Sequence, residues 1–207
     1  QGLGSLIDNV DLYFASERPE DAGRYSSAYS GEGVFDDWRD AATDPRVDSM
    51  YLATPHDAHL EQTLHAVRHS KHVLVEKPIA TTVSGAQQMV RAAREAGVTL
   101  MVSEPVRYLP AVDLCKQLVA EGAIGDVKLV QVQNEHYSVP VGWRLDRVLR
   151  GGGHLVDGGI HSLDILLNLG GTPQRVYAAE PRKVFLESGG EDGVVVTAHF
   201  SGGVVGV

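Results

Sequence analysis

The chain has 207 residues, of which 43% are hydrophobic and 22% are charged, and its formal net charge at pH 7 is −9. This is ordinary globular composition, and the length suits one large domain or two modest ones. The negative charge argues against a nucleic-acid partner, because phosphate binding needs a basic patch. No apolar run approaches the ~20 residues of a membrane span, so we expect no membrane partner either.

The single cysteine, Cys115, cannot form an internal disulfide and lies in an apolar helical pattern. We interpret it as a small core residue, and a reducing, cytoplasmic location fits this composition. The sequence begins at Gln1 with neither a methionine nor a signal peptide, and it stops within a strand-rich segment. We therefore expect a piece of a longer protein, and an upstream export signal stays open as an alternative.

Strand-like and helix-like patterns alternate through the first half of the chain. Short apolar segments predict strands at residues 10–14, 47–54, 72–76 and 99–103. Apolar residues at helical spacing predict helices at 60–67 and 86–93, after a weaker helical pattern at 19–29. This alternation is typical of an α/β fold with a Rossmann-type, doubly wound parallel sheet and right-handed crossovers.

The second half has a different pattern. A helix is expected at 112–119, a long strand at 126–137 and an apolar helix at 155–169, before strands at 174–180 and 194–200. Strands without helical crossovers between them favour an α+β domain with a mostly antiparallel open sheet. We place a domain boundary near Glu104, with a dinucleotide-binding domain at residues 1–104 and a second, incomplete domain at residues 105–207.

The G-x-G-x-x-G phosphate loop that usually opens a dinucleotide-binding domain is absent. The segment VDLYFASERPEDA (10–22) reads as the second strand and its ribose-contacting turn, so the first strand and the Gly-rich loop are expected upstream of Gln1. In that turn, Glu17 would hydrogen-bond a ribose 2′-hydroxyl, whereas Ser16 and Arg18 would accommodate a 2′-phosphate. The turn favours NADP over NAD, and a solvated turn that binds neither is an open alternative.

The segment HVLVEKPIA (72–80) ends an apolar strand in a charged pair, Glu76 and Lys77. Pro78 stops the strand ladder because it has no N–H to donate. Open α/β sheets bind their ligands at the carboxyl ends of their strands, where this pair would lie. The alternative interpretation is a surface ion pair without a functional role.

Three segments together resemble the landmarks of one enzyme family: ATPHDAHL (53–60), HVLVEKPIA (72–80) and GGGHLVDGGIHSLDILLNLGG (151–171). They are similar, in order and separation, to those of the glucose–fructose oxidoreductase/inositol dehydrogenase/MocA family of NAD(P)-dependent oxidoreductases. E-K-P alone would be weak evidence, but its pairing with a later G-G-G-x-x-x-D-x-x-x-H is specific. The resemblance covers nearly the whole chain, and it implies that the second domain binds substrate and forms a homo-oligomer through its sheet.

The resemblance implies a catalytic role for Lys77, which would hold the reacting hydroxyl or carbonyl oxygen and could exchange a proton near neutrality. It also makes His161 the general acid/base, with Asp157 as its partner or as a ligand for a substrate hydroxyl. Residues four apart lie on one helical face, and Gly158 and Gly159 between them each cost roughly 1 kcal/mol in a helix, which suggests a close backbone approach. A helix-capping aspartate and a core histidine are the structural alternative.

The remaining candidates surround these residues. The resemblance implies cofactor contacts from Ser16, Arg18, Thr54, Pro55, His56, His59, Glu76 and Lys77, although the family usually has asparagine at the position of His56. Substrate contacts are expected from Arg107, Trp143, Arg144, Asp157 and His161, with packing or salt bridges as the alternative role for the first three. The spacing of His154, Asp157 and His161 could in principle present three metal ligands, but hydride transfer needs no metal and we expect none.

The expected function is NAD(P)-dependent hydride transfer between the nicotinamide and a sugar, a cyclitol or a related polyol. One alternative keeps the fold and the bound cofactor but catalyses a net non-redox reaction, such as epimerisation, elimination or glycoside cleavage. The other is a non-catalytic module that binds a sugar or a nucleotide. The joint presence of Lys77, Asp157 and His161 argues against this last alternative.

Overall fold

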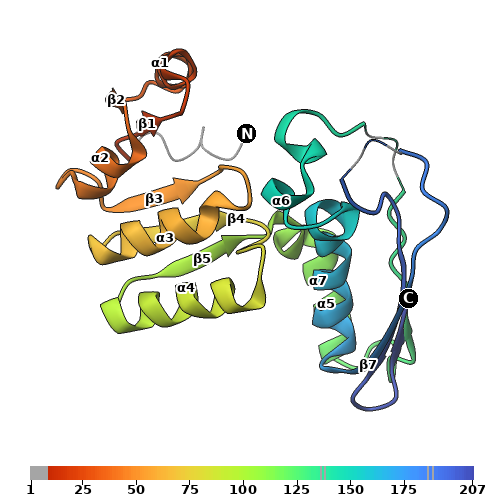
Figure 1. Ribbon diagram of the computed structural model, residues 1–207. Helices are drawn as coiled ribbons and strands as arrows, with labels where there is room; N and C mark the ends of the chain where they lie inside the picture. The colour runs from red at the N-terminus through yellow and green to blue at the C-terminus, as the bar shows by residue number, and fades with distance from the viewer. Residues whose placement is uncertain (1–8, 136, 138, 186, 188) are drawn as a thin grey trace. The chain divides into compact units, whose positions relative to one another are not determined.

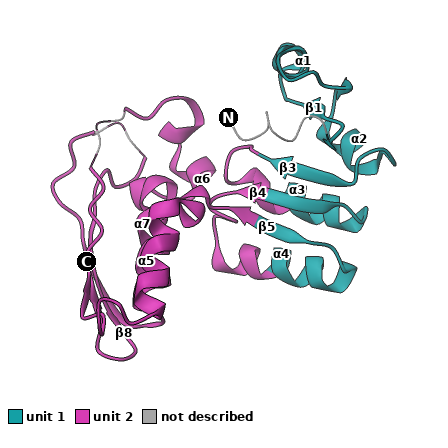
Figure 2. Ribbon diagram, turned by 180° about the vertical axis from the view of Figure 1, so that it is seen from behind, with its two compact units in different colours: residues 1–52, 61–74, 88–101 teal, residues 53–60, 75–87, 102–207 magenta. Residues whose placement is uncertain are grey.

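The computed structural model describes residues 9–135, 137, 139–185, 187 and 189–207 (Figure 1). The chain divides into two compact units that interleave along the sequence (Figure 2). The first unit comprises the residues up to Leu52 together with 61–74 and 88–101. The second unit comprises residues 53–60, 75–87 and 102–207, so it contains the segments that follow several strands of the first half.

The N-terminal part of the first unit is a small β-α-β motif. Strand β1 (Tyr13–Ala15) pairs in parallel with β2 (Gly33–Phe35), and α1 (Pro19–Ala28) connects them. Gly31 allows the chain to pass close to the core, since a Cβ there would lie 2.8 Å from the ring of Phe14. Helix α2 (Trp38–Thr43) follows and is capped by Asp37, whose carboxylate accepts a hydrogen bond of 2.8 Å from the N–H of Arg39. Neither β2 nor α2 was expected from the sequence pattern.

The central sheet has the strand order β3-β4-β5 and is flanked by two helices. Its strands are β3 (Ser49–Leu52), β4 (His72–Glu76) and β5 (Leu100–Ser103), and their arrows point in the same direction (Figure 1). Helices α3 (Ala58–Arg68) and α4 (Val83–Ala96) connect them. Val73 and Val75 of β4 are buried, at 2% and 0% exposure. The predicted α/β fold with a Rossmann-type parallel sheet is confirmed.

The later part of the second unit carries a mixed sheet with the order β6-β9-β8-β7. Strand β6 (Leu129–Val130) runs parallel to β9 (Val205–Gly206). The two remaining pairs, formed by β8 (Val195–Phe200) with β9 and with β7 (Pro173–Ala179), are antiparallel. This mostly antiparallel sheet agrees with the α+β class that the sequence predicts.

Helical segments connect and cover this sheet. They are, in chain order, the 3₁₀ turn η3 (Pro105–Tyr108), α5 (Pro110–Ala120), the 3₁₀ turn η4 (Gly142–Leu145), α6 (Arg147–Arg150), the π-type turn η5 (Leu155–Gly159) and α7 (Ile160–Gly170). Leu166 of α7 joins Val130, Ala198 and Phe200 of the sheet in a buried apolar cluster. Gly170 permits this close packing, because a Cβ there would lie 2.8 Å from the ring of Phe200.

Three expectations about the second half were wrong in detail. The strand expected at 126–137 is reduced to β6, because β9 pairs with only two of its residues. One further hydrogen bond, of 2.9 Å, joins the N–H of Val132 to the carbonyl of Val207. His136 lies outside the described residues. Cys115 is exposed, since no residue of α5 is buried. The helix expected at 155–169 begins as the π-type turn η5, at the two glycines Gly158 and Gly159.

Within the described part of the chain, no helix has both the length and the apolar character needed to span a bilayer.

Candidate active site

The two most distinctive sequence motifs meet in the second unit. Lys77 directly follows β4, and its Nζ donates hydrogen bonds to the backbone carbonyl of Asp157 and to Asp157 Oδ1, the latter at 3.2 Å. Both side chains are largely buried, with 16% and 13% of their surface exposed. The lysine of E-K-P and the aspartate of the Gly-rich motif therefore form one ion pair, although 80 residues separate them.

Three further side-chain nitrogens lie near the carboxylate of Asp157, two of them in charged guanidinium groups. The Nε atoms of Arg144 and Arg150 lie 3.1 and 3.3 Å from Asp157 Oδ2, and Nε2 of His56 lies 3.8 Å from Oδ1. Burial acts to raise the pKa of Asp157, but the charges and hydrogen bond of Lys77 and the two arginines outweigh burial and hold the pKa below its usual value. The carboxylate is therefore ionised at neutral pH and fixes the position of Lys77.

The imidazole of His161 turns to a different carboxylate. Its Nδ1 lies 2.6 Å from Oε1 of Glu104, a buried residue that follows β5. Asp157 and His161 thus come from consecutive parts of one helical segment but contact different partners. The sequence interpretation had made Asp157 the partner of His161 and had overlooked Glu104. Glu104 could have been found as a charged residue directly after a predicted strand, which is the same feature that singled out Lys77.

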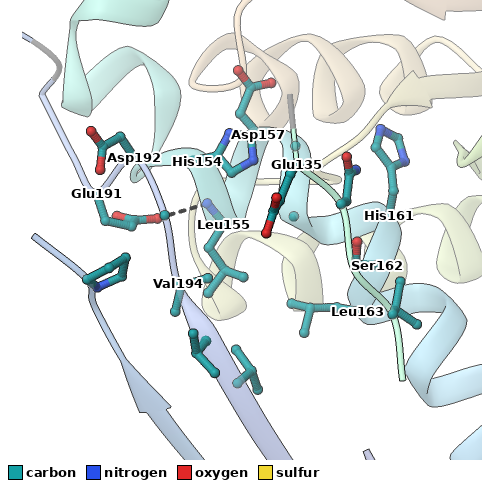
Figure 3. A pocket seen from close by; sticks show the side chains of 18 of the residues that line it. Glu135, His154, Leu155, Asp157, His161, Ser162, Leu163, Glu191, Asp192 and Val194 are labelled. Carbon is teal, nitrogen blue, oxygen red and sulfur yellow. Dashed lines mark hydrogen bonds between the residues drawn. The ribbon is translucent and has the colours of Figure 1, made fainter. Parts of the chain in front are cut away.

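Several of these residues line one cavity of about 680 Å³, a size in the range of small-molecule sites. Its wall includes Lys77, Arg144, Arg150, Asp157 and His161. Figure 3 shows His161 on one side of the cavity and the segment with Glu191 and Asp192 on the other. Cations, carboxylates and imidazoles inside a bounded volume can exchange protons with a ligand and hydrogen-bond its hydroxyl groups.

The Gly-rich motif brings the 189–194 segment against the start of η5. Glu191 Oε1 accepts a hydrogen bond of 2.9 Å from the N–H of Leu155 (Figure 3). The N–H of His154 donates to the carbonyl of Glu191 at 2.7 Å. A Cβ at Gly153 would collide with Glu191, and one at Gly158 would lie 2.7 Å from the ring of His154. The glycines of this motif therefore serve close packing around the cavity.

Two buried histidines support the backbone next to the site. His56 is 3% exposed; its Nδ1 lies 2.8 Å from the carbonyl oxygen of Arg150, and burial lowers its pKa. His59 is fully buried, with Nδ1 2.9 Å from the carbonyl of Pro78 and Nε2 3.0 Å from the carbonyl of Thr54. Its side chain braces the turn that follows β3 against the turn that follows β4, and the cofactor contact expected from His59 stays a prediction.

The other cofactor candidates occupy two places. Thr54 and Pro55 belong to the turn that follows β3, and Glu76 ends β4; all three are half-buried parts of the second unit. Ser16 and Arg18 belong to the first unit, where Ser16 Oγ accepts a hydrogen bond of 3.3 Å from the N–H of Arg18. The side chain of Arg18 is 72% exposed and pairs with Asp21.

The three further residues expected to contact substrate differ in their surroundings. Arg144 lines the cavity, and its guanidinium lies 4.4 Å from the ring centroid of Trp143. The indole of Trp143 packs edge-on against His56, with 4.7 Å between ring centroids. Arg107 binds Asp164 of α7 through two guanidinium nitrogens, so the alternative role of a structural ion pair describes it.

A metal is not suggested by the arrangement of the three residues considered for one. The carboxylate of Asp157 faces Lys77, the imidazole of His161 faces Glu104, and the ring of His154 packs over Gly158. Over the described residues, no group of three or more His, Cys, Asp or Glu side chains is arranged to hold a metal ion.

Two family models match almost the entire chain. One, described as "Oxidoreductase family, NAD-binding Rossmann fold", matches residues 13–104; the other, the "GFO/IDH/MocA C-terminal domain", matches residues 112–207. The chain belongs to the Gfo/Idh/MocA oxidoreductase family. The resemblance stated from the three sequence landmarks is confirmed.

Named members of the Gfo/Idh/MocA family are similar to this chain in sequence and structure. The 1,5-anhydro-D-fructose reductase of Ensifer adhaerens is 40% identical over 165 residues, 78% of this chain and 50% of that protein. A levoglucosan dehydrogenase in complex with NADH and levoglucosan has a TM-score of 0.83 at 29% identity, covering 95% of this chain and 56% of the other. The aldose-aldose oxidoreductase from Caulobacter crescentus, complexed with glycerol, has a TM-score of 0.88 at 30% identity, covering 99% and 64%.

The chain spans about half the length of the curated relatives it matches.

Proposed function

We propose that this chain carries the hydride-transfer site of an NAD(P)-dependent dehydrogenase or reductase that acts on the CH–OH group of a sugar, a cyclitol or a related polyol. The observation that carries the proposal is the convergence of Lys77, Asp157 and His161 on one cavity. A lysine to hold the reacting oxygen and an imidazole to exchange its proton are the two groups that such a reaction needs. The names of the relatives, which include a sugar reductase and a levoglucosan dehydrogenase, support the same substrate class.

The residues present fit a nicotinamide dinucleotide. Polar groups gather after the strands, where this fold class binds dinucleotides, and Lys77 is largely buried beside a carboxylate that keeps it in place. Thr54, Pro55, His56, Glu76 and Lys77 would hold the nicotinamide half, with His59 bracing the backbone of their turns. Ser16 and Arg18 would contact the adenosine ribose, and the exposed guanidinium of Arg18 favours NADP over NAD. When bound, the cofactor supplies the hydride acceptor or donor.

In the oxidative direction, the ammonium group of Lys77 donates a hydrogen bond to the substrate hydroxyl oxygen. Asp157, held ionised by its cationic neighbours, keeps Lys77 in that position. Nε2 of His161 takes the hydroxyl proton as negative charge develops on the oxygen. Arg144 and Arg150 line the same cavity and can hydrogen-bond further hydroxyl groups of a polyol.

The test of this function is the variant Lys77→Met, made in the protein with its full natural chain. We expect kcat for polyol oxidation to fall by about 10²–10⁴-fold, the usual contribution of a group that exchanges or polarises a proton in catalysis. The dissociation constant for NADPH or NADH, measured by fluorescence titration, should change far less. Lys116→Met, a change on α5 where Lys116 pairs only loosely with Asp113, at 3.6 Å, is the matched control. Near wild-type turnover in Lys77→Met would refute the assignment.

We also propose that residues 1–104 bind the dinucleotide, whereas residues 105–207 bind substrate and form a homo-oligomer through the sheet. The family-model boundaries, at Glu104 and Val112, support this division. All seven residues of β7 are exposed, including Val176 at 58% and Tyr177 at 71%, which supports a sheet surface that another subunit covers. Sedimentation analysis of the variant Tyr177→Glu tests this. If subunits associate through this sheet, the added charge should make the oligomer dissociate at a higher protein concentration than the wild type does.

A further inference from the structure

The carboxylate next to His161 was not among the residues that the sequence or the family landmarks single out. Glu104 Oε1 lies 2.6 Å from His161 Nδ1, and the two side chains are 11% and 24% exposed. An ionised carboxylate only accepts hydrogen bonds, so this distance assigns a proton to Nδ1 of His161. In the neutral ring, Nε2 is then the unprotonated nitrogen.

Glu104 is itself held firmly in place. Its Oε1 also accepts a hydrogen bond of 3.2 Å from the N–H of Val106, so that Glu104 caps the turn η3. The ion pair between Arg107 of η3 and Asp164 of α7 ties the same two elements together, about one helical turn beyond His161. The η3 turn and α7 are therefore joined by two side-chain contacts, one from Glu104 to His161 and one from Arg107 to Asp164. These two contacts limit how far the imidazole ring can rotate.

We propose that Glu104 is the positioning residue of the acid/base His161: it holds the imidazole in the tautomer whose Nε2 can accept the substrate proton. This inference rests on the proposed function and assigns the two carboxylates separate tasks. Asp157 positions Lys77, which holds the reacting oxygen, and Glu104 positions His161, which exchanges the proton. A single carboxylate could not serve both, because Asp157 already faces Lys77, Arg144 and Arg150.

The proton step balances around this pair. In the oxidative direction, the substrate O–H bond breaks and an N–H bond forms at Nε2 of His161, while the proton on Nδ1 stays in the bond to Glu104. A bound nicotinamide would accept the hydride from the same substrate carbon, so that a carbonyl group remains. The imidazolium that results lies beside the negative charge of Glu104, which stabilises it as in other imidazole–carboxylate pairs.

The decisive measurement is the tautomer of His161, observed by long-range ¹H–¹⁵N NMR correlation of the imidazole nitrogens above the pH range in which histidine titrates. The wild-type protein should show protonated Nδ1 and unprotonated Nε2. In Glu104→Gln, whose amide can donate as well as accept, the spectrum should shift toward the Nε2–H tautomer. An Nε2–H tautomer in the wild type would overturn the proposal, whatever the enzyme's activity.

Kinetics separate positioning from a merely structural role. Glu104→Gln should lower kcat about 10-fold or more, a part of the ~10²–10⁴-fold that an oriented acid/base contributes, with little change in KM or in NADPH binding. In a His161→Asn background the same substitution should have almost no further effect on kcat, since the group that Glu104 positions is gone. Equal fold-losses in both backgrounds would overturn the proposal.

Two matched variants guard against trivial explanations. Glu104→Thr keeps a side chain that can cap η3 but is too short to reach His161, so it should resemble Glu104→Gln in activity while retaining thermal stability. Asp113→Asn removes an exposed carboxylate of the same unit and should leave both tautomer and kcat unchanged. A wild-type protein with the expected tautomer but without polyol oxidoreductase activity would count against the proposed function and not against the positioning of His161.

Discussion

Asp44 and Asp157 both have lowered pKa values, as does Asp192, but the first two owe them to contrasting surroundings. Asp44, in the first unit, has its pKa lowered to about 2 by hydrogen bonds from Arg46, which lies two residues away and whose side chain is 61% exposed. Asp157, in the second unit, is largely buried and is held by groups that the fold brings from 7, 13 and 80 residues away, namely Arg150, Arg144 and Lys77. The Asp44 pair joins residues two apart in the chain, whereas the Asp157 cluster is assembled by tertiary packing.

The difference teaches how to interpret a perturbed carboxylate. The shift at Asp44 comes mainly from a neighbouring arginine, with a smaller contribution from Lys71, and suits a loop stabilised by nearby side chains. The shift at Asp157 occurs although burial opposes it, in a cavity with a lysine and an acid/base candidate. A perturbed pKa that depends on long-range assembly is the stronger indication of a functional site.

The largest expected effect on stability comes from Asp157→Asn. This change leaves Lys77 and the 5%-exposed Arg150 without their buried counter-charge, and breaking a buried pair in this way costs about 3–5 kcal/mol. Urea unfolding monitored by circular dichroism measures the free energy of unfolding. The comparison would fail if Asp157→Asn were as stable as the wild type.

A second expected effect concerns the glycine motif beside the same cluster. Gly153→Ala should destabilise the protein by about 1–3 kcal/mol, because the new Cβ meets the backbone of Glu191, which cannot yield easily. Gly23→Ala, in α1 of the first unit, is the matched control: nothing lies within 4 Å of its Cβ, so removing a helical glycine there should stabilise by up to ~1 kcal/mol. Thermal unfolding of both variants should shift in opposite directions.

The loss of stability in mild acid should be smaller than the effects of Asp157→Asn and Gly153→Ala, and it should come partly from His56. Burial lowers the pKa of His56 in the folded state, so below about pH 6.5 the unfolded chain binds more protons than the folded one. Stability is therefore lost as the pH falls below that value. His56→Asn should flatten this part of the profile, while His199→Asn, at an exposed position in β8, should leave it unchanged. An unaltered acid limb in His56→Asn would contradict the assignment.

The smallest expected effect is that of Asp44→Asn. The side chain of Arg46 is 61% exposed, so the loss of this ion pair should change stability only slightly at neutral pH. Because the folded-state pKa is about 2, the contribution of Asp44 is present above its ordinary pKa of 3.8 and is lost as the pH falls toward 2. Unfolding curves of wild type and variant should therefore converge only at strongly acidic pH.

Much of the fold follows from the sequence where the patterns are strong. Strand β4 spans the predicted residues 72–76, because an apolar run with a following proline leaves few other structures. Helices α3, α4 and α5 lie where apolar residues recur at helical spacing. The three-residue strand β2 and the six-residue helix α2 were missed because they are shorter than any periodicity can reveal.

The candidate site was predictable only in part. Lys77 was singled out by its place at a strand end and by the family landmarks, Asp157 and His161 by the landmarks, and the structure adds their contacts. Glu104 carries only the weak signal of a charge after a strand, and no local pattern marks Arg150, since the partners of both come from other segments. Sequence patterns find elements and strand ends; which charge meets which depends on tertiary packing.

The interleaving of the two units has a consequence for any attempt to dissect the protein. The chain passes from one unit to the other after residues 52, 60, 74, 87 and 101, so the segments that carry His56 and Lys77 belong with Asp157 and His161 and not with the strands that precede them. A cut near Glu104 would give two polypeptides, each with only part of the reacting groups. Neither half could be exchanged with that of a relative as an independent cassette; the site would have to be reconstituted from both pieces together.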